Sequence, residues 1–361
     1  CADMDNMAGI MEERENECPG EQIRRGRTAV IFAGLGLLLL AVFSVSLLWG
    51  SANIPWRELA AEMGHAETRA SGRWSEILIN IRLPRVLLAA LVGASLACAG
   101  ACLQGVFRNP MADPYILGVS AGGAVGATIS MAFRLDRHLP FLNPLTLFAF
   151  LGSFATAGIV YAFSLRNGRI QVTTLLLTGL ALSALLSAIM SFIVVVSVVE
   201  DLAQTVYFWL LGGFYRAGWK EVGQVLPATL VGCLVIWFFS RELNAMVLGD
   251  ETARSVGVDV ERTKKWLLVA AALACASSVS VAGIIGFVGL ITPHVVRLLI
   301  GPDHRVLVPA SAIAGAIFMM GCDTIARSIT PKTEIPVGIL TAFLGVPFFL
   351  YLMKTSRNIY F

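Results

Sequence analysis

The amino-acid sequence predicts an all-α, polytopic membrane protein with about ten transmembrane helices. Three observations lead to this fold class. Hydrophobic residues make up 57% of the 361-residue chain and charged residues only 14%, whereas about 25% charged residues is typical of soluble proteins. The mean hydropathy is +0.75. Apolar stretches also recur from residue 28 to residue 353, which indicates many spans rather than a single anchor.

The apolar stretches, taken in chain order, define the individual spans. A helix needs roughly 20 apolar residues to cross a bilayer. The candidate spans cover residues 28–49, 85–107, 115–133, 143–164, 173–199, 223–240, 264–283, 285–300, 306–325 and 336–353. The span at 285–300 is short and contains Pro293. The longest gap, residues 50–84, contains Trp56 and Trp74 and is expected to form an interfacial loop with short helices.

The placement of Lys and Arg predicts that both termini are cytoplasmic, because cytoplasmic loops carry the excess of basic residues. The basic residues assigned to that side include Arg24, Arg25, Arg27, Arg166, Arg169, Arg241, Arg254, Arg262, Lys264, Lys265, Lys354 and Arg357. The expected organisation is one transmembrane domain over residues 28–355 with a cytoplasmic loop at 241–264. Polar tails flank it at 1–27, whose native origin the sequence leaves open, and at 356–361.

Charge and cysteine usage exclude several kinds of function. The net charge of +3 is too small to indicate a nucleic-acid partner. Of seven cysteines, Cys98 and Cys102 lie four residues apart in one span, but no His or carboxylate accompanies them. That residue set does not resemble a metal site. The chain also lacks the Gly-x-x-x-x-Gly-Lys-Ser/Thr pattern that cradles nucleotide phosphates, so we expect no enzymatic activity from it alone.

Several segments are polar or rich in Pro and Gly, which a plain helical bundle does not require. Pro110 and Pro114 interrupt helix continuation and predict a tight cytoplasmic re-entry between two spans. The segments are Ile81-Arg82-Leu83-Pro84-Arg85, residues 104–120, 248–258 and 283–305, and the late pair Asp323–Arg327 and Glu334–Gly338.

Together, in this order, these segments resemble the permease subunits of ATP-binding cassette importers for iron-siderophores, haem and vitamin B12. The resemblance covers residues 28–355. It implies a homodimer with one translocation path at the twofold axis, two copies of a separate ATPase, and an extracytoplasmic binding protein. It also implies the cell membrane of a bacterium or archaeon, which is the inner membrane in a Gram-negative species. No cofactor is expected on this chain, because ATP and Mg²⁺ bind the ATPase.

The cargo implied by the resemblance is a bulky metal chelate that moves inward. A ferric siderophore is the first expectation, followed by haem or cobalamin, and oxyanions such as molybdate are rarer in this group. The alternative is an ion- or proton-coupled secondary transporter. That class predicts inverted repeats and ionisable residues near the bilayer midplane. His294, inside a span, raises the question of haem ligation, but a single His without a partner does not make a ligand set.

The resemblance assigns Arg82, Arg85 and Arg327 to docking of the binding protein. Arginine suits this role because its planar fork grips carboxylates through two hydrogen bonds. One alternative is that these side chains extend to lipid headgroups. For Arg327, an internal pair with Asp323 is equally consistent with the sequence. We expect Asp323 and Glu334 to be satisfied by a helix end or by an arginine.

The cytoplasmic loop is the expected contact with the ATPase. The resemblance implies a pair of coupling helices, and the sequence predicts a short helix that Gly257 ends. Apolar contacts are assigned to Leu248, Ala253 and Val256, and polar contacts to Asp250, Glu251 and Arg254. Gly249 lies at the start of the segment. The alternative is a solvated connector.

The resemblance also places residues of the translocation path. The inner gate positions are Asn109 and Met111 in the re-entry, and Val172 and Thr173 before the fifth span. Within that span the assigned path residues are Thr178, Ser183 and Ser187. A weakly polar wall suits a large cargo that must be released. The alternative is that these hydroxyls bond to carbonyls of their own helix.

Overall fold

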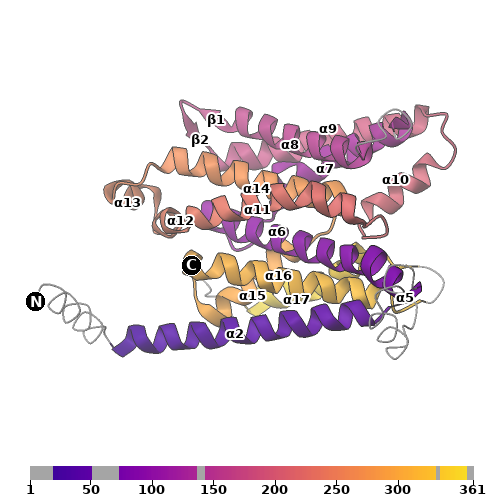
Figure 1. Ribbon diagram of the computed structural model, residues 1–361. Coiled ribbons are helices and arrows are strands. Elements are labelled where there is room, and N and C mark those ends of the chain that lie inside the picture. Colours follow the sequence, from indigo (N-terminus) through magenta and orange to yellow (C-terminus); the bar gives the residue numbers. More distant parts are fainter. Residues whose placement is uncertain (1–18, 51–72, 136–142, 331–333, 356–361) are drawn as a thin grey trace, which may run out of the picture.

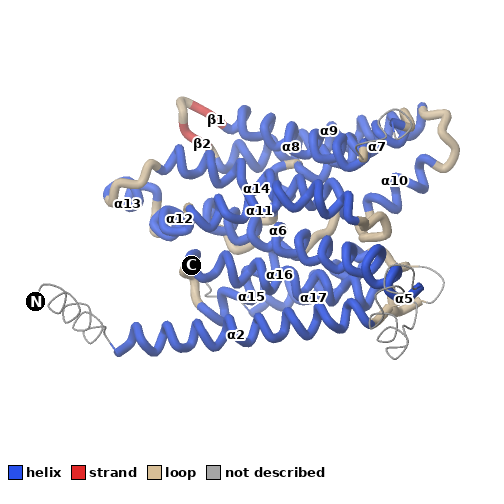
Figure 2. The backbone as a smooth tube through the Cα atoms, in the orientation of Figure 1, coloured by secondary structure: helices blue, strands red, loops and turns tan. Residues whose placement is uncertain are grey.

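The computed structural model describes residues 19–50, 73–135, 143–330 and 334–355. Within them, helices account for nearly all of the regular structure, as the tube in Figure 2 shows. The strands are β1 (Leu165–Arg166) and β2 (Arg169–Ile170), which form one antiparallel hairpin. The all-α fold class is therefore confirmed.

Each predicted span contains one helix. Among the described residues, seven helices are long and apolar enough to cross a membrane, and α7, α15 and α17 are shorter apolar helices. The helices are α2 (Pro19–Leu48), α6 (Leu83–Phe107), α7 (Val119–Ala132), α8 (Pro144–Ser164), α9 (Val172–Val196), α11 (Trp219–Phe238), α14 (Val260–Ala282), α15 (Val288–Ile300), α16 (His304–Ala326) and α17 (Val337–Thr355).

Shorter elements connect these helices. The predicted cytoplasmic loop contains α12 (Ser240–Val247) and α13 (Asp250–Ser255), and the predicted re-entry contains a 3₁₀ turn, η2 (Pro114–Leu117). A π-helical segment, η1 (Ile77–Arg82), leads from α5 (Arg73–Glu76) into α6. Residues 51–72 of the predicted interfacial loop lie outside the described residues. The sequence did not predict α10 (Leu202–Leu210).

The helices run side by side between two ends of the molecule (Figure 1). The start of α2, the hairpin β1–β2, α12, α13 and the end of α17 lie at one end, on the left in Figure 1, and we call it the loop end. Helices α5 and α10 lie at the opposite end, which we call the outer end after the orientation that the sequence predicts. Both ends of the described chain therefore lie at the loop end, as an even number of crossings requires.

Helix α6 lies at the centre of the bundle and packs closely against its neighbours. A Cβ atom added at Gly93 would lie 2.1 Å from the Gly315 carbonyl oxygen of α16, and one at Gly100 would lie 1.8 Å from the Gly289 carbonyl oxygen of α15. Any side chain at these positions would push the helices apart. Small residues thus let backbones touch, which is how helices associate in lipid.

The helix is interrupted between α14 and α15, and one side chain from the re-entry forms hydrogen bonds with the non-helical backbone there. Gly283 and Phe287 both have positive φ, so the helix does not continue across residues 283–287. The Tyr115 hydroxyl donates to the Ile285 carbonyl oxygen at 2.8 Å and accepts from the Ile285 N–H at 3.0 Å. Both backbone groups at the break are therefore satisfied inside the bundle, as non-helical backbone at membrane depth requires.

Candidate functional site

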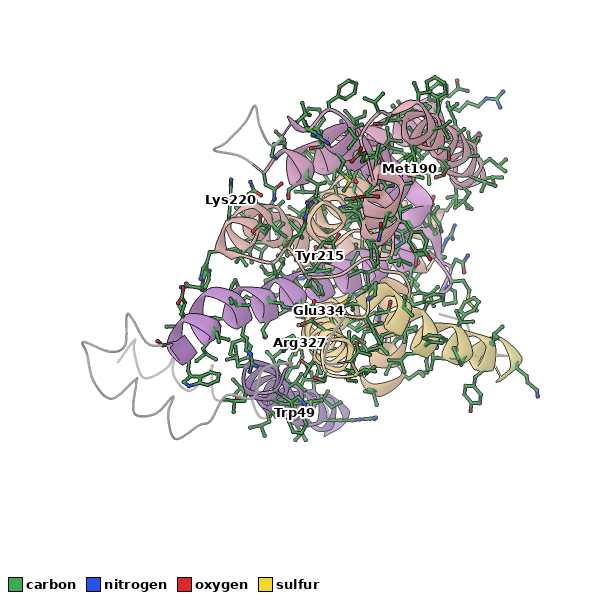
Figure 3. The ribbon with its side chains drawn as sticks, turned by 90° about the vertical axis from the view of Figure 1, so that its right-hand side faces the viewer. Trp49, Met190, Tyr215, Lys220, Arg327 and Glu334 are labelled. Carbon is green, nitrogen blue, oxygen red and sulfur yellow. The ribbon has the colours of Figure 1, made fainter. Side chains whose placement is uncertain are left out.

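Arg85, near the start of α6, joins two carboxylates at the outer end. Its Nε and Nη2 atoms donate to Asp323 of α16 at 2.8–3.1 Å, and its Nη1 atom donates to Glu334 at 2.9 Å. Asp323 is 1% exposed and Glu334 is 43% exposed. The expectation that an arginine satisfies both acids is confirmed. Glu334 is the solvent-facing member of this group, and Figure 3 shows it beside Arg327.

The other two predicted docking arginines face inward, which corrects the expectation that they lie on the surface. Both are 4% exposed. Arg82 Nη1 donates to the carbonyl oxygens of Leu47 and Leu48 at 2.8 and 2.7 Å. Arg327 donates to the Ser46 carbonyl oxygen. Helix α2 ends here with unpaired carbonyls, so both guanidinium groups cap its C-terminus, where cations are favoured.

The predicted internal pair of Arg327 with Asp323 also exists. Arg327 Nε lies 3.5 Å from Asp323 Oδ2, one helical turn away. Asp323 therefore interacts with two arginines, and its contacts to Arg85 are shorter. A docking role for the three arginines stays a prediction. Among the described residues of this group, Glu334 is the most exposed, at 43%, and it pairs with Arg85.

The cytoplasmic loop folds as two short helices that meet at Gly249. Its φ of +125° is one that side chains rarely adopt, so this glycine allows the sharp turn from α12 into α13. Gly257, with φ of +88°, follows α13 as predicted. The side chains of Leu248 and Val256 are 74% and 68% exposed. Ala253 is fully buried in the chain's own core, so its predicted contact with a partner is corrected to an internal packing role.

Ion pairs hold α13 against the bundle. Asp250 accepts from Lys264 of α14 at 2.5 Å and lies 3.9 Å from the guanidinium of Arg108, next to the re-entry. At the other end of α13, Arg254 donates to Glu261 of α14 at 3.2 Å. Two polar residues assigned to partner contacts therefore have internal partners, while Glu251 is exposed.

A second polar tie joins α12 to the start of α16. Asn244 donates to Asp303 at 2.7 Å and accepts from the His304 backbone N–H at 2.8 Å. Partial burial acts to raise the pKa of Asp303, but hydrogen bonds from Arg305 and Asn244 lower this pKa to about 2. Asp303 therefore stays charged. Sequence analysis did not identify Asn244, because its partner lies 59 residues away and no local pattern marks the pair.

Helix α9, which carries the predicted path residues, is together with α2 the least covered of the long helices in the described part of the chain. Only Leu175 and Gly179 are buried along its 25 residues. Thr173 and Ser187 are exposed and lie fourteen residues apart, close to four turns, so they share one face. Thr178 and Ser183 are half-buried. Two of the predicted path residues thus lie on the exposed face of α9, and the other two lie at the edge of its buried face.

The predicted gate residues lie where the chain turns at the loop end. In the re-entry, the Asn109 side chain accepts from the Met111 backbone N–H at 2.9 Å, which stabilises a local turn. Val172 is the first residue of α9, directly after the hairpin. The hairpin itself is fastened to α14, because the Ile170 N–H donates to Glu261 at 3.1 Å.

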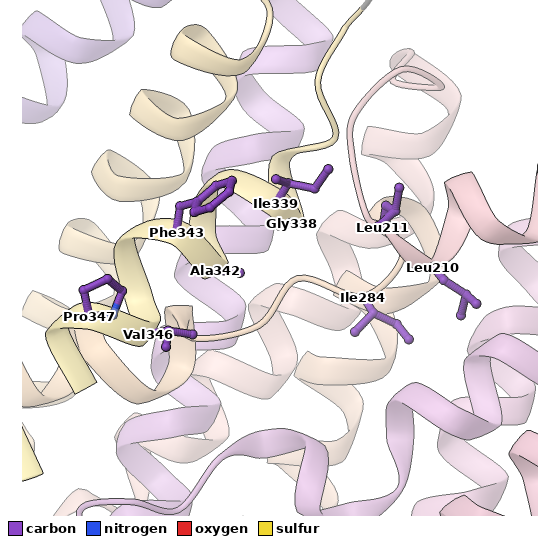
Figure 4. A pocket seen from close by; sticks show the side chains of 9 residues that line it. All are labelled: Leu210, Leu211, Ile284, Gly338, Ile339, Ala342, Phe343, Val346 and Pro347. Atoms are coloured by element: carbon purple, nitrogen blue, oxygen red, sulfur yellow. The ribbon is translucent and has the colours of Figure 1, made fainter. Parts of the chain in front are cut away.

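An apolar hollow that the sequence did not reveal lies between α10, the non-helical segment after α14, and α17. Its volume is about 560 Å³. Figure 4 shows Phe343 and Val346 of α17 on one side and Leu210 and Ile284 on the other. No charged side chain lines it. Three distant segments contribute these residues, so no sequence pattern marks the hollow.

No metal centre was found among the described residues. They contain no group of three or more His, Cys, Asp or Glu side chains placed to hold an ion. His294 is 3% exposed, and neither ring nitrogen has a hydrogen-bond partner in the described part of the chain. Cys98 and Cys102 are buried free thiols.

Comparisons with known proteins agree with this architecture. A model of the FecCD transport family matches residues 38–355. The "Cobalamin import system permease protein" of Halobacterium salinarum is 45% identical over 84% of this chain and 80% of that protein. The "Hemin transport system permease protein" of Yersinia pestis is 39% identical over 90% of this chain and 96% of that protein.

A solved structure also has this fold. It is described as an inward-facing conformation of a putative metal-chelate type ABC transporter. The TM-score is 0.76 at 32% sequence identity, and the match covers 91% of this chain and 99% of the other. The order of helices described above is therefore that of a known transporter subunit.

Proposed function

We infer the cargo and the assembly of this chain from one premise, that it belongs to the FecCD transport family. As a family member, the chain is the multi-pass membrane permease of an ATP-binding cassette importer for metal chelates, and ATP hydrolysis belongs to a separate subunit. We propose that two copies form one inward path for a bulky metal chelate. An extracytoplasmic binding protein delivers the cargo at the outer end, and the ATPase docks at the loop end.

The exposed surface of the predicted cytoplasmic loop is the observation that carries this proposal. Helices α12 and α13 lie at one end of the bundle and expose Leu248 and Val256. Ion pairs hold α13 in place, so its exposed side is presented in a fixed orientation. An ATP-driven importer needs such a surface for its ATPase, whereas a secondary transporter does not. The comparisons give no support to that alternative.

The exposed face of α9 supports a homodimer with the path at its axis. In the single chain this helix packs mainly on one side, and its free face carries Thr173 and Ser187. A second copy would cover part of this surface and leave a weakly polar channel beside it. Hydroxyl and small apolar groups bind a large chelate weakly, which permits release.

The cargo within the metal-chelate class is also a proposal. We place cobalamin first, because the 45% identical relative is named for cobalamin import. Haem comes second, on the 39% identical relative. The ferric siderophore, which was the first expectation from the sequence, is third. The exposed path face contains no charged side chain that would select among the three.

Reconstitution tests the proposal. The full chain, its ATPase and its binding protein are placed in liposomes and supplied in parallel with cyanocobalamin, haemin and a ferric hydroxamate. We expect uptake of at least one probe that requires ATP inside and the binding protein outside. Uptake that follows an ion gradient without ATP or the ATPase would refute the proposal.

A calorimetric titration of the binding protein with the same three probes identifies the cargo independently. The probe that binds is expected to be the one transported, because the path face itself offers little selectivity. Uptake of a probe that the binding protein does not bind would show that this chain selects its own cargo.

A further inference from the structure

Glu261, near the start of α14, connects two segments that are distant in sequence. Its Oε1 atom accepts from Arg254 of α13 at 3.2 Å, and its Oε2 atom accepts from the backbone N–H of Ile170 at 3.1 Å. One carboxylate thus bridges α13 to the hairpin. Ile170 lies two residues before Val172, where α9 begins.

The three segments that meet at Glu261 differ in how firmly they are held. Helix α14 packs against α6, α8 and α11, and most of its residues are buried. Helix α9 buries only Leu175 and Gly179. Helix α13 is about one and a half turns long and buries only Ala253. A shift of α13 therefore meets little resistance at α9 and much at α14.

The two contacts of Glu261, with Arg254 and with the Ile170 N–H, share one negatively charged carboxylate. Glu261 lies in the first turn of α14, where the helix dipole favours a negative charge. Its carboxylate is 27% exposed, so water does not fully replace either contact. Hydrogen bonds to an ionised acceptor are about twice as strong as neutral ones. If Arg254 moves, it therefore pulls on the same carboxylate that accepts the hydrogen bond from Ile170 in the hairpin.

On the assembly stated under Proposed function, we propose that Glu261 is a positioning residue that carries displacement of α13 to the start of α9. When the ATPase moves α13, the pull on Glu261 changes its hold on the Ile170 N–H. The hairpin then releases or tightens the first turn of α9, with Val172 and Thr173. The inner end of the path thereby responds to the nucleotide through Glu261.

Asp250 makes a comparable connection to the re-entry, which contains the gate residues Asn109 and Met111. It pairs with Lys264 of α14 and lies 3.9 Å from Arg108, the residue before Asn109. One end of α13 is therefore close to the residue before Asn109, and the other is connected through Glu261 to a residue two positions before Val172. The Asp250–Arg108 contact is the longer one, so we assign the stronger coupling to Glu261.

Hydrogen–deuterium exchange of the full chain tests the bridge first without any partner. Removing the acceptor in Glu261→Ala is expected to speed exchange of the Ile170 amide by at least about tenfold, the effect of losing one charge-assisted hydrogen bond. Arg262→Gln removes an exposed charge from the next residue and is expected to leave that exchange unchanged. Unchanged exchange in Glu261→Ala would overturn the proposal before any ATPase is added.

The second measurement uses the complex with the ATPase, with and without a non-hydrolysable ATP analogue. In the wild type, we expect nucleotide to change exchange in peptides covering both 250–256 and 165–175. Glu261→Ala should keep the first change and lose the second, and Glu261→Gln, which retains one acceptor oxygen, should show a partial loss. A purely structural role would alter both peptides together.

The outcomes separate this inference from the proposed function. If Glu261→Ala keeps both nucleotide-dependent changes, or the wild type responds only at 250–256, the relay through Glu261 is wrong and the importer role stands. If the wild-type chain binds no ATPase, the proposed function itself fails. Should Glu261→Ala not fold, Glu261→Gln carries the same comparison with Arg262→Gln.

Discussion

Arg85 shows how one residue can join a buried carboxylate to an exposed one. It binds the buried Asp323 and the half-exposed Glu334 at the same time. Removing one partner of a buried ion pair typically costs about 3–5 kcal/mol, because the other charge is left unpaired. Substituting Arg85 by Glu would therefore damage the fold as well as any docking. The exposed carboxylate, Glu334, offers the cleaner test.

We predict that Glu334→Gln tightens docking of the binding protein. The change removes the internal carboxylate that competes for Nη1 of Arg85, so an acidic residue of the partner can take its place. An exposed pair is worth about 0.2–1 kcal/mol, which corresponds to an affinity gain of up to about fivefold. Calorimetric titration of the reconstituted chain with the binding protein measures this gain. Glu200→Gln, at another exposed carboxylate, is the control.

The docking prediction fails if Glu334→Gln binds no more tightly than Glu200→Gln. Such a result would mean that the partner does not use the Arg85 fork. Arg82 and Arg327 would then be assigned only to capping α2, where both already have carbonyl partners.

Residue-level contacts were predicted from the sequence only where they are local. The Asp323–Arg327 pair is one turn apart on a helix and was anticipated. The Arg85–Asp323 pair spans 238 residues, and only the packing of α6 on α16 brings it together. The inward orientation of Arg82 also depends on where α2 ends, which the apolar pattern does not fix.

At the level of elements, the resemblance implied a pair of helices in the loop between α11 and α14, and the structure has two, although the residues themselves predicted only the second. Gly249 explains the division, since its backbone conformation excludes most side chains. Burial then follows from the spacing on α13. Ala253 faces the core, while Val256, beyond the last turn, faces solvent.

We predict that Val256→Asp weakens assembly with the ATPase and leaves the chain folded. The side chain is 68% exposed, so a charge there costs little in the free chain but is desolvated unpaired in an interface. Loss of ATPase on affinity co-purification measures the effect, and we expect at least a tenfold loss, about 1.4 kcal/mol. Val198→Asp, at an almost fully exposed valine near the outer end, should co-purify normally. Equal retention of the ATPase by both variants would contradict the assignment.

Helix α10 was not predicted because its nine residues are too short for a span. The search for spans relied on apolar length, and a short amphipathic helix between two of them has no such signal. The residues of α12 and α13 that contact α14 and α16 were missed for a related reason. Lys264 was counted only as a cytoplasmic charge, although it is buried against Asp250.

For the whole molecule, the apolar pattern was sufficient to predict the number and order of the long helices. Hydrophobic length is dictated by the bilayer, so it can be recognised without knowledge of tertiary packing. The arrangement of the helices is a different matter. It depends on where glycines let two backbones touch, and a glycine in the sequence does not name its partner helix.

The contact between α6 and α16 leads to a stability prediction. A Cβ atom on Gly315 would lie 2.3 Å from the Gly93 carbonyl oxygen, so Gly315→Ala must separate the helices. We expect a loss of about 1–3 kcal/mol, the usual cost of overpacking, and a lower melting temperature in detergent. Gly321→Ala is the control on the same helix, because no atom lies within 4 Å of its added Cβ. There we expect no loss, since Ala favours helices over Gly.

A melting temperature that is equal for the two variants would show that α6 and α16 can separate without cost. The close approach would then be unimportant for stability. If both variants were equally destabilised, the loss in Gly315→Ala could not be assigned to its contact with Gly93, because Gly321 has no such contact.

The Tyr115 hydroxyl has a consequence for where the chain can bend. Because it satisfies both backbone groups of Ile285, moving η2 away from the break would leave two polar groups without partners in a medium that contains no water. The turn that contains Tyr115 is therefore a fixed point of the bundle. A hinge in the re-entry must lie before this fixed point, at the short turn of Asn109 to Met111. Opening at the loop end would accordingly swing the first half of the re-entry and leave its second half fixed.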